Sequence, residues 1–169
     1  AYYSDIHSGS IIAKVTHRDS TRNKKTESFI KTMERDKKYT LEEYQKFFKT
    51  VKEYKDNLYN FLSDLKVKGN RIYAYGAPAK GNTLLNYCGI TNELIDKAVE
   101  VNKLKLGFYL PQSHIPIVLE DKEDLPDYYL LLSHNFAEEI IEKNKDILAK
   151  GVKFIIPFPE IKVVGGAQW

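Results

Sequence analysis

The sequence predicts an α/β protein in which a parallel sheet is flanked by helices and preceded by an N-terminal strand and a long helix. Short apolar runs alternate with helical patterns between residues 70 and 158, as in sheets whose strands are joined by helical crossovers. Few polar residues interrupt these runs, which is typical of strands covered on both faces. A glycine-containing turn joins the first run to its helix.

The N-terminal segment predicts one strand and then a linker. Residues 7–10 form a turn before the β-branched run at residues 11–15. We expect this strand to be disordered, or to pair at an edge of the sheet or with a second copy, because an unpaired strand is a template for pairing. Residues 19–25 are charged or hydroxylic and predict a linker, and a helical pattern begins at Thr26.

A long helix is predicted from Thr40 to Lys68. Thr40 and Glu43 have the spacing of a capping box, and Gly69 and Asn70 end the pattern. Apolar residues recur at three- and four-residue steps, so the helix carries one continuous stripe. The stripe either covers a face of the sheet or forms a coiled-coil dimer, and both interpretations stay open. Its residues are Leu41, Tyr44, Phe48, Val51, Tyr54, Leu58, Phe61 or Leu62, and Leu65.

The turn after the first strand, residues 71–75, has the features of an anion site. Gly76, Pro78 and Gly81 match the dinucleotide-binding fingerprint except at its middle glycine. Such a turn leaves the first N–H groups of the following helix without intrahelical partners, and the helix dipole favours an anion there. Lys80 adds a positive charge at the same place. The turn is therefore predicted to bind phosphate.

The rest of the chain predicts short elements in the alternation that a sheet of four or five parallel strands requires. Pro116 confines one strand to the sheet edge or to an irregularity of a parallel ladder, because proline cannot donate to the hydrogen-bond ladder. Asn135 is placed to cap a helix and Gly151 to end it. The elements are a short helical piece at residues 92–95, strands at residues 97–101, 115–118, 127–132 and 152–158, a helix at residues 136–150, and a last short strand at residues 161–164.

Three strand ends converge on one edge of the predicted sheet, where parallel α/β proteins bind ligands. These ends are residues 76–82, 100–102 and 133–135. Glu100 has the separation from the turn at which an acidic residue meets a ribose hydroxyl, and Asn102 follows it. We therefore expect the binding site at this edge.

Each residue of the turn also has a purely structural interpretation. Gly76 and Gly81 could serve only to make a steep connection between strand and helix. Lys80 could be a solvated surface lysine, and Asn82 could be a helix cap. Both interpretations are compatible with the sequence.

No catalytic or metal-binding arrangement is recognisable in the sequence. It contains neither a Ser/His/Asp set with a nucleophile turn nor a metal-ligand spacing. His114 and His134 lie beside loops, where a lone histidine is more often structural than catalytic, although either has the chemistry of a base near neutral pH. Cys88, the single cysteine, is predicted to be a buried thiol and is compatible with a reducing cytoplasm.

Composition argues against two classes of partner. The 169 residues include 26 basic and 23 acidic ones, and the formal charge of +3 is too small to indicate nucleic-acid binding. No apolar run approaches about 18 residues, and no leader or lipidation signal is visible, so we expect a soluble cytoplasmic protein away from membranes.

Two motifs follow one another in the second half of the chain. The first is Gly-Ala-Pro-Ala-Lys-Gly-Asn-Thr-Leu-Leu-Asn-Tyr-Cys-Gly-Ile at residues 76–90, and the second is Lys105-x-Gly107-x-Tyr109-Leu110-Pro111 followed by His114-Ile115-Pro116-Ile117. Together they resemble the C-terminal domain of S-adenosylmethionine-dependent sugar C-methyltransferases, over roughly residues 70 to 160. His7-Ser8-Gly9-Ser10 is similar to the His-Gly-Gly-Ser motif of that family, with Ser8 in place of the first glycine.

The resemblance implies that residues 70–169 form a Rossmann-like domain that helps to hold a nucleotide sugar. Residues 1–20 would be a strand left from a preceding catalytic domain, and residues 21–69 a helical linker. In that family the preceding domain binds S-adenosylmethionine, so we expect an inactive fragment that binds no cofactor itself. The absence of an initiator methionine fits such a fragment. The candidate binding residues are Gly76, Pro78, Lys80, Gly81, Asn82, Glu100, Asn102, Tyr109 and His114.

Two other functions stay open. One is an independent NAD(P)-type dinucleotide-binding oxidoreductase, against which stand Pro78 at the middle-glycine position and the lack of a second catalytic half. The other is a structural or homodimerisation module that acts through residues 40–68. Ligand binding distinguishes the methyltransferase domain from the oxidoreductase, and light scattering tests the dimerisation module.

Overall fold

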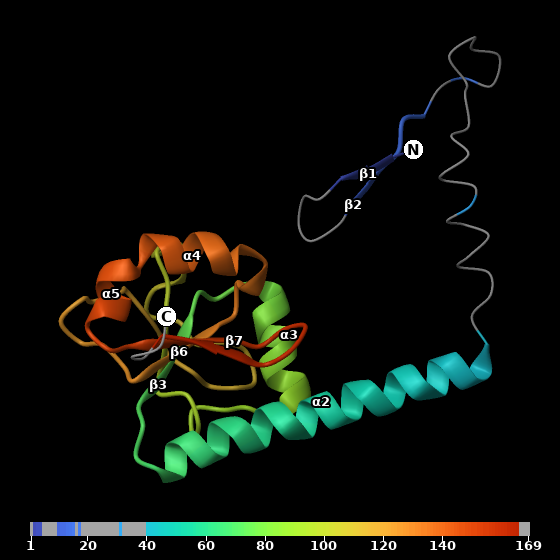
Figure 1. Ribbon diagram of the computed structural model, residues 1–169. Coiled ribbons are helices and arrows are strands. Elements are labelled where there is room, and N and C mark those ends of the chain that lie inside the picture. Colours follow the sequence, from blue (N-terminus) through green and yellow to red (C-terminus); the bar gives the residue numbers. More distant parts are fainter. Residues whose placement is uncertain (1, 5–9, 16, 18–30, 32–39, 166–169) are drawn as a thin grey trace. The chain divides into compact units, whose positions relative to one another are not determined.

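The computed structural model describes residues 2–4, 10–15, 17, 31 and 40–165. The chain divides into two compact units, Ala1–Thr50 and Val51–Trp169 (Figure 1). The boundaries predicted at residues 20 and 69 from the resemblance stay predictions.

The N-terminal strand pairs within its own unit. Strand β1 (Tyr2–Ser4) runs antiparallel to β2 (Ser10–Ile12), with Tyr3 opposite Ile11. The expectation that β2 would be disordered or would pair at an edge of the main sheet was wrong, because the preceding segment of the same chain supplies a local partner. Pairing of β2 with a second copy stays a prediction. The linker predicted at residues 19–25 and most of the helix predicted from Thr26 lie outside the described residues.

The long helix α2 (Leu41–Val67) forms as predicted. Its capping box is complete, because the N–H of Thr40 donates to Glu43 Oε2 at 2.7 Å and the N–H of Glu43 donates to Thr40 Oγ1 at 3.2 Å. After the helix, Gly69 has a φ of +82°, a left-handed conformation that glycine adopts without strain.

The apolar stripe of α2 has two different environments. Leu58, Leu62 and Leu65 are buried in the core of the second unit. Leu41 and Phe48, nearer the start of the helix, are 74% and 65% exposed. The later part of the stripe therefore packs on the sheet, and the dimer interpretation stays a prediction.

The second unit is built on a six-stranded sheet in the order β5-β4-β3-β6-β7-β8. Neighbours from β5 to β7 are all parallel, which confirms the predicted Rossmann-like sheet, and β5 occupies the edge expected from Pro116. Strand β8 is antiparallel to β7, because the chain returns through a turn too short for a parallel crossover. The strands are β3 (Ile72–Tyr75), β4 (Lys97–Val99), β5 (Ile117–Val118), β6 (Tyr128–Leu131), β7 (Lys153–Ile156) and β8 (Lys162–Val164).

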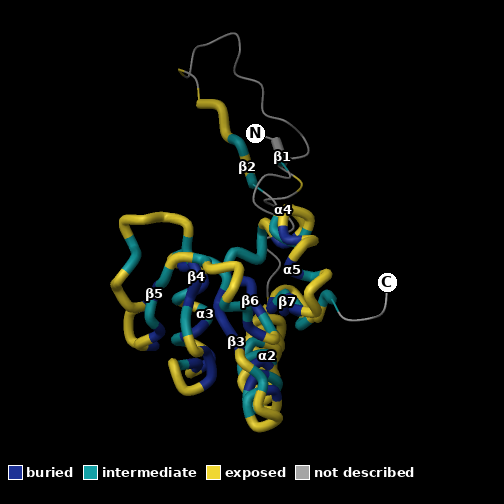
Figure 2. The backbone as a smooth tube through the Cα atoms, turned by 90° about the vertical axis from the view of Figure 1, so that its left-hand side faces the viewer, coloured by how far each residue is buried: buried dark blue, intermediate teal, exposed yellow. Residues whose placement is uncertain are grey.

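Two apolar cores lie on opposite faces of the sheet. Successive strand residues point to opposite faces, so Ile72 joins one core and Tyr73 the other. Helices α2 and α3 (Ala79–Cys88) cover the first face, and α4 (Ala137–Lys143) and α5 (Lys145–Ala149) cover the second (Figure 1). The inner strands are largely buried, whereas the loops around β5 are exposed (Figure 2).

Residues 92–95 form a single turn and not the predicted helical piece. The N–H groups of Leu94 and Ile95 both donate to the Thr91 carbonyl at 3.1 Å. The turn does not extend into a helix, because the chain is already extended at Lys97, where β4 begins.

The helix predicted at residues 136–150 is broken into α4 and α5 at Asn144. The buried side chain of Asn144 donates to the Ile140 carbonyl at 2.7 Å and to the Tyr75 hydroxyl at 3.1 Å, so it competes with the backbone for helical hydrogen bonds. The prediction that Asn135 caps this helix was wrong, because Asn135 lies within a short 3₁₀ helix that precedes α4.

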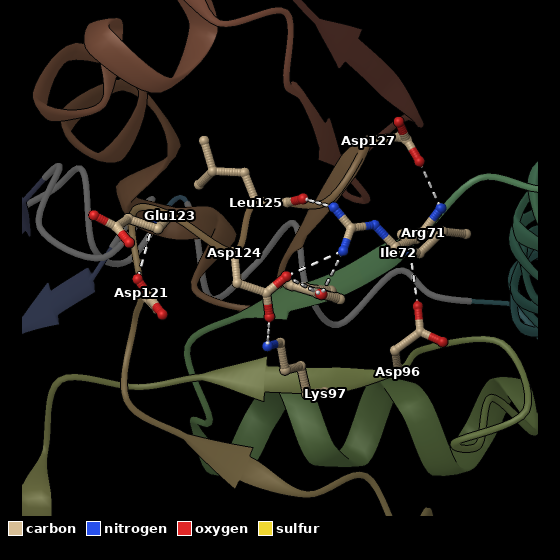
Figure 3. A network of polar contacts seen from close by, with 10 residues as sticks. Arg71, Ile72, Asp96, Lys97, Asp121, Glu123, Asp124, Leu125 and Asp127 are labelled. Carbon is tan, nitrogen blue, oxygen red and sulfur yellow. Dashed lines mark hydrogen bonds and ion pairs between the residues drawn. The ribbon is translucent and has the colours of Figure 1, made fainter.

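Charged side chains form a network of polar contacts at the amino ends of the strands (Figure 3). Asp124 forms ion pairs with Arg71 and Lys97, and its Oδ1 accepts a hydrogen bond from the Tyr73 hydroxyl at 3.0 Å. Asp127 Oδ2 accepts from the N–H of Arg71 at 2.7 Å. These polar groups engage one another and tie β3 and β4 to the segment before β6.

Candidate functional site

The candidate site lies at the carboxyl ends of the strands. Its first part is the turn between β3 and α3. Gly76 has a φ of +83°, and its N–H donates to the Val99 carbonyl at 2.8 Å. A Cβ atom at this position would lie 2.9 Å from Ser133 Oγ. Glycine is therefore needed both for the turn and for the close approach of the ends of β3 and β6.

Gly81 lets α3 pack closely on β6. A Cβ atom at Gly81 would lie 2.6 Å from Leu132 Cβ, which matches the packing role of the last glycine in a dinucleotide fingerprint. Asn82 lies inside α3, so its interpretation as a cap was wrong. The cap position belongs to Pro78, which makes no side-chain cap hydrogen bond. The first N–H groups of α3 thus have the arrangement that favours an anion.

Glu100 holds the loop after β4 against this turn. Its carboxylate accepts hydrogen bonds from the N–H groups of Ala77, Val101 and Asn102 at 3.0, 2.9 and 3.1 Å. Lys105 Nζ donates to it at 3.2 Å. Burial of the side chain acts to raise the pKa of Glu100, but these donors, Asn102 first, outweigh burial and lower the pKa. The carboxylate is ionised and engaged, and its contact with a ribose hydroxyl stays a prediction.

A cavity of about 230 Å³ lies beyond the carboxyl ends of the strands. It is located where the strand order reverses, with β4 and β5 on one side of β3 and β6 and β7 on the other. Open α/β sheets bind ligands at such a switch point. We call this space the switch-point cavity. Its lining residues are Tyr75, Gly76, Pro78, Val99, Glu100, Val101, Lys105, Glu120, Ser133 and Ile140.

A wider groove of about 700 Å³ lies between the start of α3 and the loop after β4, and we call it the loop groove. It shares Pro78 and Lys105 with the switch-point cavity, so the two spaces adjoin. Leu104, Phe108 and Tyr109 give it exposed apolar surface. Its other lining residues are Ala77, Ala79, Asn82, Thr83, Leu110, Pro111 and Ile117.

Lys105 is a site residue that the argument from strand ends missed, because it lies in a loop. Its Nζ donates to the Ala77 carbonyl at 2.9 Å and to Glu100 Oε2, so the side chain crosses from the loop to the turn. The signal that marks it in the sequence is the second motif, which begins at this lysine.

Lys80 is exposed on the first turn of α3 and lines neither the cavity nor the groove. Burial lowers the pKa of His134, and the positive charge of Lys80 lowers it further. The His134 ring lies 5.6 Å from the Phe158 ring, and its Nδ1 has no hydrogen-bond partner among the described residues. His134 is therefore neutral near pH 7, and the phosphate contact of Lys80 stays a prediction.

The remaining predicted site residues lie apart from one another. Asn102 caps a short 3₁₀ helix, because its Oδ1 accepts from the N–H of Leu104 at 3.0 Å. His114 is exposed in a turn with a φ of +56° and lines neither space. The structure thus brings together Gly76, Pro78 and Glu100 in the cavity, and Pro78, Asn82 and Tyr109 in the groove.

Glu120 lines the switch-point cavity, although no motif marks it in the sequence. It follows β5, and its Oε1 is buried without a hydrogen-bond partner among the described residues. Burial raises the pKa of Glu120, against the opposing charge of Lys122 and a hydrogen bond from Tyr75. Of the two acids in the cavity, Glu120 is the one with an unused oxygen.

The strand order, the glycine turn and the cavity at the switch point define a Rossmann-like α/β domain. The family model of the C-methyltransferase C-terminal domain matches residues 5–159, and the chain belongs to this family, which confirms the resemblance. C-methyltransferase NovU from Streptomyces niveus is 36% identical over 123 residues. These residues make up 72% of this chain and 29% of that protein, so the chain spans less than a third of the relative's length.

The described part of the chain contains no helix with both the length and the apolar character needed to cross a bilayer.

Proposed function

We propose that this chain is the part of an S-adenosylmethionine-dependent sugar C-methyltransferase that holds the nucleotide-sugar substrate. The observation that carries the proposal is the pair of adjoining spaces, the switch-point cavity and the loop groove, at the uncapped start of α3. Membership of the C-methyltransferase C-terminal domain family supports the reaction class. The partner of this chain would be a methyltransferase domain that precedes it.

The sizes of the two spaces support an elongated ligand. The cavity, at about 230 Å³, is smaller than the roughly 300–1,000 Å³ of ordinary ligand pockets, whereas the groove, at about 700 Å³, lies within that range. A nucleotide sugar has two bulky ends joined by a narrow diphosphate. The diphosphate would pass Pro78, close to the N–H groups at the start of α3 and to the charge of Lys80.

We assign binding and orientation to this chain and proton transfer to the preceding domain. S-adenosylmethionine, bound by that domain, would supply the methyl group. Glu100 and Lys105 line the cavity, but their polar atoms are engaged with each other and with the backbone of the turn. They therefore shape the site and are not available as a base.

The dinucleotide-binding alternative has the strand order in its favour, because β5-β4-β3-β6-β7 is the arrangement of a dinucleotide-binding sheet. Two observations disfavour it. Pro78 occupies the position of the middle glycine, and Glu100, which would bind the ribose, already accepts four hydrogen bonds.

The proposal is tested by thermal shift and titration calorimetry on this chain with four ligands in parallel. These are uridine diphosphate glucose, thymidine diphosphate glucose, NAD and S-adenosylmethionine. A ligand present at one hundred times its Kd stabilises a protein by about 2.7 kcal/mol, which corresponds to a rise of roughly 5–10 °C in Tm for a chain of this size. We expect that rise with a nucleotide sugar and none with S-adenosylmethionine.

A rise with NAD alone would contradict the proposal and favour the oxidoreductase. No rise and no heat of binding with either nucleotide sugar would also contradict it.

A further inference from the structure

Two acidic residues, Glu100 and Glu120, line the switch-point cavity, and they differ in how many hydrogen bonds they accept from the protein. A carboxylate offers about four lone-pair sites. In Glu100, the N–H groups of Val101 and Asn102 occupy Oε1, and Ala77 and Lys105 occupy Oε2. The acceptor capacity of Glu100 is therefore used up inside the protein.

Glu120 provides the open acceptor of the cavity. Its Oε1 is shielded from bulk solvent and has no hydrogen-bond partner among the described residues. A buried acceptor without a partner opposes folding, so a ligand that donates a hydrogen bond there would relieve an existing cost.

One tyrosine of the cavity lining bonds to Glu120, and a second tyrosine packs beside the first. The Tyr75 hydroxyl, in the cavity lining, accepts from Asn144 Nδ2 at 3.1 Å and donates its own proton to the Glu120 carboxylate. Tyr129 is fully buried with its ring centroid 5.3 Å from that of Tyr75, and its hydroxyl has no partner among the described residues. Burial raises the pKa of Tyr129, and the charge of Glu120 raises it further, so this hydroxyl stays protonated. The free group of this cluster in the cavity lining is therefore an acceptor, on Glu120, and an acceptor suits a ligand that donates, such as an alcohol O–H.

Size and charge favour a sugar ring over a phosphate in this cavity. At about 30 Å³ per water, a space of about 230 Å³ equals roughly seven or eight waters, which is room for one ring and too little for a nucleotide sugar. The lining residues include two acids, Glu100 and Glu120, and one cation, Lys105, so a phosphate would meet a net negative lining. The start of α3 suits the phosphates better.

We infer that Glu120 is a specificity-determining residue that accepts a hydrogen bond from a hydroxyl group of the sugar ring held in the switch-point cavity. This inference rests on the proposed function, because it places a nucleotide sugar in this crevice. The hydroxyl belongs either to the pentose of the nucleotide or to the hexose, and the choice of ligands in the test distinguishes the two.

The test is calorimetric titration of the full chain with uridine diphosphate glucose, for wild type, Glu120→Ala and Glu123→Ala. Glu123 is an exposed acid on the same loop that does not line the cavity, so its removal changes the charge equally. We expect Glu120→Ala to weaken binding about ten- to one-hundred-fold, as for a lost hydrogen bond to a charged group, and Glu123→Ala to leave it unchanged. Loss of a negative charge near a diphosphate would by itself strengthen binding, so the sign of the effect is diagnostic.

Stability measurements separate lost recognition from lost folding. Glu120→Ala removes both a buried oxygen without a partner and the acceptor of the Tyr75 hydroxyl, two effects of opposite sign, so its Tm should stay close to that of wild type. Glu120→Gln is the second variant, and it should weaken binding less than Glu120→Ala because its amide oxygen still accepts.

A titration with uridine diphosphate assigns the ring. If Glu120→Ala weakens uridine diphosphate as much as the glucose conjugate, the hydroxyl is that of ribose; if only the conjugate is weakened, it is that of glucose. Wild-type affinity in both Glu120 variants would overturn the inference and leave the proposed function standing. Failure of wild type to bind any nucleotide sugar would overturn the proposed function and this inference with it.

Discussion

Glu100 and Glu120 show, at the scale of the residue, how position decides the use of a carboxylate. Both follow neighbouring parallel strands and line one cavity. The loop after β4 turns its own N–H groups of Val101 and Asn102 onto Glu100, whereas the Oε1 of Glu120 receives no donor among the described residues. Glu100 therefore holds the loop after β4 to the turn, whereas Glu120 keeps an oxygen that can accept a further hydrogen bond.

We expect Glu100→Gln to lower the free energy of unfolding at pH 7 by about 1–3 kcal/mol, because the amide cannot reproduce charge-assisted hydrogen bonds from several donors. The folded pKa of Glu100 lies below its ordinary value of 4.5, so its contribution is complete above that pH. It is lost as the pH falls through the folded pKa. Urea denaturation of both proteins between pH 7 and pH 3 measures the difference.

Glu123→Gln is the matched control, since its side chain is exposed, and it should change stability by less than about 0.5 kcal/mol. A deficit in Glu100→Gln that persisted undiminished at pH 3 would show that the ionised carboxylate is not its source.

Lys80→Ala tests the phosphate assignment. We expect it to weaken nucleotide-sugar binding by about 1–3 kcal/mol, with a smaller loss at high salt because the lysine is exposed. Its removal should also raise the pKa of His134, which NMR titration measures, but not to the ordinary value, since burial is the larger cause. Unchanged affinity for every nucleotide sugar would remove Lys80 from the site, while easy unfolding of the variant would make it structural.

Helix α2 shows, at the scale of the element, that a continuous apolar pattern can serve two environments. The capping box starts the helix, and periodicity carries it to Gly69, so its existence follows from local interactions. Which part of the stripe is buried depends on the sheet, against which Leu58, Leu62 and Leu65 pack.

We expect Leu62→Ala to destabilise the protein by about 2–5 kcal/mol, because Leu62 is fully buried and its truncation leaves a cavity. Phe48→Ala, on the same helix, removes a larger side chain that is mostly exposed, and it should cost less than about 0.5 kcal/mol. Urea denaturation compares the two variants. If Phe48→Ala proved as costly as Leu62→Ala, the first part of the stripe would be an interface, and light scattering would show a dimer.

At the scale of the whole molecule, the amino ends and the carboxyl ends of the strands carry different sets of polar groups. At the amino ends of the strands, Asp124 and Asp127 pair with cations and backbone groups and hold the strands together. At the carboxyl ends, the uncapped start of α3, the cavity and the open oxygen of Glu120 lie together. The charged network that joins the starts of the strands therefore lies at the opposite end of the strands from the proposed binding site.

Much of the fold follows from the sequence by itself. The alternation of strands and helices, the capping box at Thr40, the glycine turn at Gly76 and the edge position of β5 depend on residues close together along the chain. Hydrophobic periodicity and the special conformations of glycine and proline report such short-range preferences directly. The convergence of strand ends on one edge, and hence the place of the site, follows from the parallel order alone.

Only the tertiary structure decided which side chains at the carboxyl ends of the strands keep an unused hydrogen-bonding atom. Whether all acceptor positions of Glu100 are used depends on Ala77 and Lys105. The hydrogen bonds of Glu120 depend on Tyr75, which lies in the same cavity lining but far from it in sequence. The break at Asn144 likewise depends on its contact with Tyr75. Periodicity records how a chain folds locally, but hydrogen-bond satisfaction is a property of residues that meet only after folding.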